Sequence, residues 1–160
     1  MKLTNQDLCQ TALLAAFIAV SGSLKIPSII PGSEFQLSAP IAVAICGVFG
    51  VKKYLTAGIA ASVICLLLGT QNLFNVMIAL CFRAVIAAIF IAAGPRRLFY
   101  IISGPVASMA SRLVLSLFVG QAALALVAAA VPGMIFTAVT APALAAVLQR
   151  FSFARRTLKA

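Results

Sequence analysis

Histidine and tryptophan are absent from this sequence, and only two of its 160 residues are acidic, Asp7 and Glu34. Without histidine, a Ser–His or Cys–His nucleophile and an imidazole metal site cannot form, and the two isolated acids do not make a catalytic pair. A P-loop is also absent, so the chain carries no ATP-hydrolysing motif of its own. We therefore expect a protein that is not an enzyme and that holds neither a metal ion nor a cofactor.

Charge is scarce as well, because charged residues make up 9% of the chain, whereas hydrophobic residues make up 64% and the mean hydropathy is +1.18. Soluble domains are about one quarter charged, so this composition predicts an integral membrane protein. The four cysteines occur singly, without a CxxC pair, and are expected to be packing residues. A spanning helix needs about 20 apolar residues, so residues 1–160 are expected to form one membrane domain with no separate soluble domain.

Apolar runs separated by glycine, proline and charge predict an all-α bundle of six transmembrane helices, because lipid offers the backbone no other hydrogen-bond partner. The expected spans are 7–24, 38–51, 54–69, 72–93, 98–119 and 132–149. Segment 122–131 is too short to cross and is expected to lie at the surface or to dip in and return. A cleaved signal peptide is the alternative for the first run, but Asp7 and the lack of a small-x-small cleavage site favour a span.

The distribution of cations predicts the orientation of these spans. With a cytoplasmic N-terminus, the outer segments carry Lys25 alone and the cytoplasmic segments carry nine cations. These nine are Lys2, Lys52, Lys53, Arg96, Arg97, Arg150, Arg155, Arg156 and Lys159. Such a bias in short loops predicts that both termini are cytoplasmic, and it explains the net charge of +10 better than nucleic-acid binding does.

Arg83 and Arg112 are the two cations that fall inside expected spans. Arg83 lies about 11 residues, or ~17 Å, into the fourth span, and Arg112 lies slightly outside the midplane in the fifth. Each burial costs at least about 2.5 kcal/mol unless it is compensated, and the spans contain no carboxylate to pair with either residue. The compensating anion could come from a ligand or from Glu34; the structural alternative is that carbonyls of a kinked neighbouring helix satisfy the guanidinium groups.

Polar and small residues recur at helical spacing in the last three spans, in the half nearer the outer surface. They are Asn72, Asn75, Ala79 and Arg83; Gly104, Ser108, Arg112 and Ser116; and Gly133, Thr137 and Thr140. Three polar faces at one depth predict a pocket that opens to the outside. The alternative is structural, because such residues also hold helices together and serine or threonine can bond its own backbone.

The first span contains overlapping AxxxA patterns, formed by Ala12 with Ala16 and by Ala15 with Ala19. Small residues at this spacing allow another helix to approach closely. The approaching helix could belong to this chain, in which case the alanines serve internal packing, or to another membrane subunit. The spacing leaves both alternatives open.

These features together resemble the substrate-binding S components of energy-coupling factor (ECF) transporters. The resemblance rests on six short spans, on "ALLAAFIAV" in the first, on the outer loop running into "EFQLSAPIAVAICGVFG", on "KK" after the second, and on "FRAV" and "GPVASMASRLVLSL" at midmembrane depth. It implies high-affinity capture of a vitamin or similar micronutrient, here an anionic one, at the plasma membrane of a bacterium or archaeon. It also implies partners, namely a membrane coupling subunit and two cytoplasmic ATPases, with the loop between the first two helices acting as a lid.

The resemblance implies roles for particular residues. The coupling-subunit surface maps onto Ala12, Ala15, Ala16 and Ala19. The substrate site maps onto Glu34, Phe35, Gln36, Asn72, Asn75, Arg83, Arg112 and Thr137, to which the polar stripe of the fifth span adds Ser108. The sequence departs from the patterns of the riboflavin, thiamine and biotin members, so the substrate is left open.

Two alternatives to this reading remain at this point. The chain could be a membrane scaffold or assembly factor whose polar stripes only join helices, or a self-contained carrier or channel, although no pair of inverted repeats is visible. For Glu34 itself, the candidates for a partner are the ligand, Arg83 or Arg112 in the empty pocket, and Lys25 at the surface.

Overall fold

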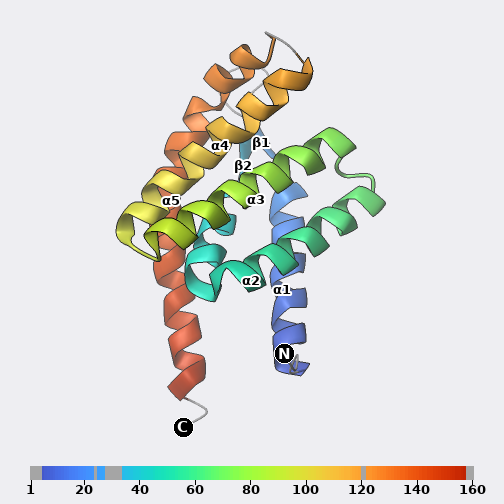
Figure 1. The fold of residues 1–160 in the computed structure, drawn as a ribbon. Helices are drawn as coiled ribbons and strands as arrows, with labels where there is room; N and C mark the ends of the chain where they lie inside the picture. Colours follow the sequence, from blue (N-terminus) through green and yellow to red (C-terminus); the bar gives the residue numbers. More distant parts are fainter. Residues whose placement is uncertain (1–4, 24, 28–33, 120–121, 158–160) are drawn as a thin grey trace.

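The computed structural model describes residues 5–23, 25–27, 34–119 and 122–157. Within these ranges the chain forms five helices and one small antiparallel sheet (Figure 1). In chain order the elements are α1 (Asn5–Ser23), β1 (Lys25–Pro27), β2 (Glu34–Gln36), α2 (Ser38–Leu67), α3 (Leu73–Ala93), α4 (Arg97–Val119) and α5 (Ala122–Thr157). The protein is thus a helical bundle, as predicted, with a short hairpin between the first two helices.

Four of the described helices are long and apolar enough to cross a membrane, which makes this a multi-pass membrane protein. The qualifying segments are Ser38–Leu67, Leu73–Ala93, Arg97–Leu117 and Ala130–Arg150. Six separate spans were expected, and the described part of the chain does not provide them. Two helices account for the difference between six expected and four observed candidate spans. Helix α1 is not among the four candidates, and α2 contains two of the expected spans in one helix.

Helix α2 is bent at Gly50, where the backbone has φ 83° and ψ 166°. Only glycine adopts this conformation readily, because a side chain would collide with the neighbouring peptide groups. The expected spans 38–51 and 54–69 are therefore the two halves of one element, joined at the bend, which is visible in Figure 1. Lys52 and Lys53 follow the bend directly and begin the second half.

Helix α5 is continuous from Ala122 to Thr157 and passes through Pro132 and Pro142. The expectation that 122–131 forms a separate surface or re-entrant segment is therefore wrong. Prolines are tolerated inside membrane helices because neighbouring helices and small adjustments satisfy the freed backbone groups, and breaking the helix in lipid would expose many more.

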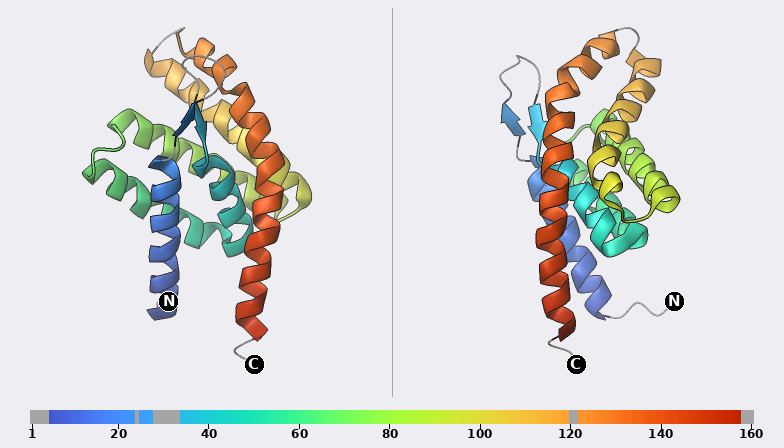
Figure 2. Two further views of the ribbon diagram at one scale, coloured as in Figure 1. Left: turned by 180° about the vertical axis from the view of Figure 1, so that it is seen from behind. Right: turned by 90° about the vertical axis from the view of Figure 1, so that its left-hand side faces the viewer.

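The helices cross one another rather than running in parallel. In Figures 1 and 2, α1 and α5 extend along the long direction of the molecule, while the second half of α2 and α3 form a pair that crosses them. The start of α1 and the end of α5, which are nearest the termini, lie toward one end of the molecule, and the β strands, the end of α4 and the start of α5 lie toward the other (Figure 1). Lys53 forms a salt bridge with Asp7 in the first turn of α1, so this basic pair lies beside the start of α1; that this end is cytoplasmic stays a prediction.

The described helices expose large apolar side chains on the outside of the bundle, as expected when lipid is the solvent, and bury several polar residues in a mainly apolar core. Large apolar side chains such as Leu13, Leu67, Ile91 and Leu117 are exposed on the outside of the bundle. The buried polar residues are Ser21, Ser62, Arg83, Ser103, Ser108, Ser111 and Thr137. Several of these surround one cavity.

Candidate functional site

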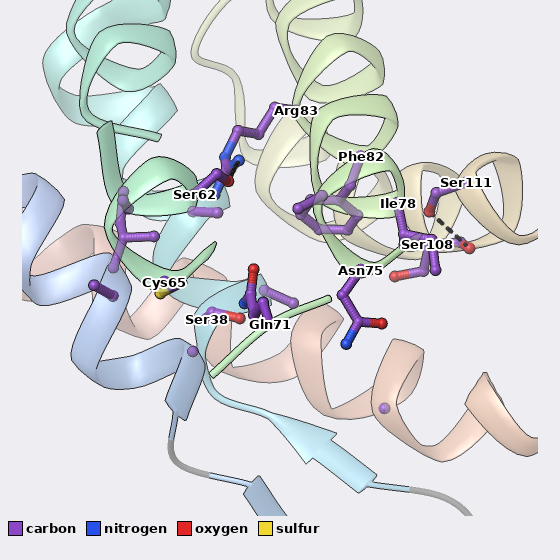
Figure 3. A pocket seen from close by; sticks show the side chains of 18 of the residues that line it. Ser38, Ser62, Cys65, Gln71, Asn75, Ile78, Phe82, Arg83, Ser108 and Ser111 are labelled. Carbon is purple, nitrogen blue, oxygen red and sulfur yellow. Dashed lines mark hydrogen bonds between the residues drawn. The ribbon is translucent and has the colours of Figure 1, made fainter. Parts of the chain in front are cut away.

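A cavity of about 440 Å³ lies among all five described helices (Figure 3). Its walls come from the last turns of α1, both ends of α2, the turn after α2, the first half of α3, the second half of α4 and the early part of α5. A cavity of this size lies within the range of about 300–1,000 Å³ that is typical of small-molecule sites. The bundle therefore contains room for a vitamin-sized ligand at the level where the polar stripes were predicted.

Arg83 lies in one wall and is only 8% exposed. Its Nη1 donates a hydrogen bond of 2.6 Å to Oγ of Ser62 on the second half of α2. The side chain also lies against Gly58, where an added Cβ atom would be 2.7 Å from the Arg83 Cδ. Arg83 thus occupies a space that exists because position 58 has no side chain, and its described hydrogen-bond partner is neutral.

Arg112 lies in the α4 wall and is half-buried. Its Nη1 donates to the backbone carbonyl of Ser108, one turn earlier in the same helix, at 3.3 Å. This bond is long, and it uses one of the five N–H groups of the guanidinium. Arg112 is therefore only loosely tied to its own helix.

No aspartate or glutamate is found among the described residues that line the cavity. Asp7, one of the two acids, forms a salt bridge of 2.8 Å with Lys53, whose Nζ also donates to Gln10 Oε1 at 2.6 Å. This cluster ties α1 to α2 toward the end with the termini. The cavity walls described here thus carry two guanidinium groups without a carboxylate.

The structure brings five of the predicted substrate-site residues together at the cavity: Asn75, Arg83, Ser108, Arg112 and Thr137. Asn72, in contrast, is exposed and caps α3, where its Oδ1 accepts a 2.8 Å hydrogen bond from the backbone N–H of Asn75. This is the ordinary role of asparagine at a helix N-terminus, and it places Asn72 outside the lining of the cavity.

Thr137 combines a cavity position with a packing role. Its hydroxyl donates to the carbonyl of Gly133 at 2.8 Å, and its side-chain carbons press against Gly104 of α4. Ser116 and Thr140 likewise donate to carbonyls of their own helices, at 2.6 Å each, and neither lines the cavity. For these last two residues the structural alternative is the one observed.

The outer loop forms a hairpin in its described parts. Backbone register pairs Lys25 with Gln36, Ile26 with Phe35 and Pro27 with Glu34. The side chains of Glu34, Phe35 and Gln36 lie outside the described part, so their roles at the ligand and the partner of Glu34 stay predictions.

The two alanine pairs of α1 do not share one face, contrary to the single coupling surface expected from them. Ala12 and Ala16 are exposed, whereas Ala15 is 2% exposed in the core and Ala19 is half-buried at the cavity. The difference arises because α1 packs against α2 along the side that carries Ala15 and Ala19. Of the four alanines, only Ala12 and Ala16 are exposed, and their role at a partner subunit stays a prediction.

Five polar residues at the cavity were not predicted from the sequence: Ser38, Ser62, Thr70, Gln71 and Ser111. Ser62 follows Gly58 by four residues, the spacing used to find the other stripes, so it could have been recognised in the same way. Ser111 donates to the carbonyl of Ala107 at 2.6 Å. Gln71 comes from the turn between α2 and α3, where no helical periodicity could have revealed it.

Comparison with known proteins identifies a relative. The chain is 48% identical over 139 residues to "Protein BioX" of Lysinibacillus sphaericus, and the match covers 87% of this chain and 84% of that protein. The chain belongs to the BioX family. No model of a protein family matches it, and no solved structure matches it. The relationship to BioX extends over most of both chains, so it concerns the membrane bundle as a whole.

Proposed function

We propose that this protein is the substrate-binding S component of an ECF transporter, and that it captures a small anionic nutrient in the cavity between its helices. The observation that carries this proposal is that Arg83 and Arg112 line one cavity whose described walls contain no carboxylate. The protein acts as a binding subunit and not as an enzyme, and a coupling subunit with two ATPases in the plasma membrane supplies the energy for uptake.

Charge explains why an anion suits this cavity. Two guanidinium groups within the membrane region are costly unless they are compensated, and a carboxylate or phosphate would accept charge-assisted hydrogen bonds from both. Among the described residues, each guanidinium group donates to a neutral oxygen, the Ser62 hydroxyl for Arg83 and the Ser108 carbonyl for Arg112. Ile78, Phe82 and Leu115 add apolar surface for the hydrocarbon part of such a ligand.

The BioX relationship supports a vitamin-related ligand, and biotin is the first candidate because of the relative's name. Biotin carries one carboxylate, which matches the charge argument. The sequence lacks the pattern of the known biotin-binding members, so the proposal includes carboxylates that are chemically related to biotin.

Equilibrium binding tests this proposal with the protein purified in mild detergent or lipid nanodiscs. We expect saturable binding of radiolabelled biotin, and at least about tenfold weaker binding of biotinamide, which keeps the ring system and lacks the charge. A tagged chain should also co-isolate a membrane coupling subunit and two ATPases. Absence of saturable binding and of these partners would favour the membrane scaffold, for which the polar residues only join helices.

A further inference from the structure

We infer that Gly58 and Ser62 form a seat on α2 that fixes the Arg83 guanidinium at the cavity wall, and that this seat sets the preference of the cavity for an anionic ligand. The inference rests on the proposed function. It assigns a positioning role to two residues that do not belong to any of the polar stripes predicted from the sequence.

The seat follows from spacing and from the size of glycine. Residues 58 and 62 are four apart in the second half of α2, so they lie one above the other on the same helix face. At Gly58 the Arg83 side chain lies where a Cβ would be, with Cδ 2.7 Å and Cζ 3.2 Å from that position. One turn further along, Ser62 accepts the hydrogen bond from Arg83 Nη1 at 2.6 Å. The side chain is thus held along its length and at its end.

The chemistry of the seat leaves the positive charge of Arg83 available. A carboxylate in place of Ser62 would neutralise the guanidinium, whereas a hydroxyl orients one N–H and leaves the charge for a ligand. Figure 3 shows Arg83 together with Ser62 and apart from the Ser108–Ser111 side of the cavity. An arginine that is ordered before binding loses less conformational freedom when the ligand arrives, which strengthens binding.

The test compares variants of the seat with matched variants elsewhere in the core. Ser62→Ala removes the acceptor, and Ser103→Ala removes a buried hydroxyl of α4 that does not line the cavity. Gly58→Ala displaces Arg83, and Gly47→Ala produces an equally close contact, with Tyr100 instead. The readout is the ratio of the affinities for biotin and biotinamide, because a purely structural defect would weaken both ligands alike.

We expect Ser62→Ala and Gly58→Ala to lower the biotin-to-biotinamide ratio by about tenfold, the size of one hydrogen bond to a charged group. Ser103→Ala and Gly47→Ala should leave the ratio unchanged. Ser62→Thr, which keeps the hydroxyl, should retain most of the preference. An unchanged ratio in both seat variants, with biotin still bound, would overturn the inference.

A second measurement is independent of any ligand. Ser62→Ala should lower the midpoint of thermal unfolding by about 2–4 °C in the parent protein and by less than half as much in an Arg83→Met background. Equal losses in the two backgrounds would show that Ser62 does not act through Arg83 and would overturn the seat. If this coupling is found and no saturable biotin binding is detected, the proposed function fails and the role of the seat in anion selection fails with it.

Discussion

Arg83 combines features that a purely structural residue would not need. It is buried in a membrane bundle, its described partner is a serine, and the neighbouring helix has a glycine where the arginine passes. A buried charge without a counter-charge lowers stability, and under the proposed function a bound anion offsets this cost.

This reasoning predicts the effect of Arg83→Met on the ligand-free protein. Removing the charge should leave the midpoint of thermal unfolding unchanged or raise it by up to about 4 °C, although the affinity for an anion is lost. The measurement is thermal unfolding in detergent without added ligand, with Arg96→Met, at an exposed position between α3 and α4, as the control. A marked loss of stability specific to Arg83→Met would support the scaffold reading, in which the arginine joins α2 to α3.

The spacing of polar residues in the sequence predicted some residues that line the cavity, and it also selected residues that do not line it. Regular intervals in α3 and α4 correctly brought Asn75, Arg83 and Arg112 to one cavity. Regular intervals in α4 and α5 also selected Ser116 and Thr140, whose hydroxyls donate to carbonyls of their own helices. At the same spacing, a serine or threonine hydroxyl can either face a cavity or donate to a carbonyl of its own helix. Only the packing of neighbouring helices decides which of these occurs.

Among the elements, α1 has two faces with different roles. Ala15 packs inward on α2, and Ala16 lies on the outside among exposed apolar side chains such as Leu13 and Phe17. The AxxxA spacing indicated close approach of another helix, but it could not show that the two alanine pairs point in different directions.

A pair of bulky substitutions tests this division. Ala16→Trp should leave ligand binding intact and block co-isolation of the coupling subunit, because it enlarges only the outer face. Ala15→Trp should lower the yield of folded protein, since overpacking a core position typically costs about 1–3 kcal/mol or more. Size-exclusion chromatography, biotin binding and co-isolation measure these effects. If Ala16→Trp abolishes binding and assembly together, the outer face belongs to the internal packing of the chain.

The bend in α2 shows the limit of hydropathy as a guide to elements. The apolar runs on both sides of Lys52–Lys53 were correctly located. Hydropathy does not reveal, however, whether two apolar runs are separate helices joined by a loop or halves of one helix with a kink at a single residue. Gly50 provides the joint through its backbone conformation.

Gly50→Ala is therefore expected to destabilise the protein by about 1–3 kcal/mol, because the residue would be held in a region of φ and ψ that is almost restricted to glycine. The added Cβ would meet no atom of a more distant residue within 4 Å, so the loss would come from the local backbone conformation alone. Gly133→Ala is the control, since it also has open space but lies within a helix; it should be neutral or stabilise by about 0.5–1 kcal/mol. Thermal unfolding of both variants measures the difference, and equal behaviour would contradict a special role for Gly50.

For the whole molecule, composition was the most reliable guide. Few charges, high hydropathy and basic clusters at the ends of apolar runs predicted a multi-pass helical bundle, and four described helices have the length and composition to cross a membrane. The cavity depends on how distant helices meet, and the crossing of the α2–α3 pair over α1 and α5 is set by side-chain packing that periodicity does not encode.

The proposed function requires this BioX-family protein to capture an anion with Arg83 and Arg112. Mass spectrometry of the small molecules that copurify in mild detergent tests this requirement, with wild type compared with an Arg83→Met/Arg112→Met variant that is folded and equally pure. Wild type is expected to retain a metabolite bearing a carboxylate or phosphate, and the variant is expected to lose it. Recovery of only neutral or cationic molecules, or equal recovery of the same anion from both proteins, would contradict it.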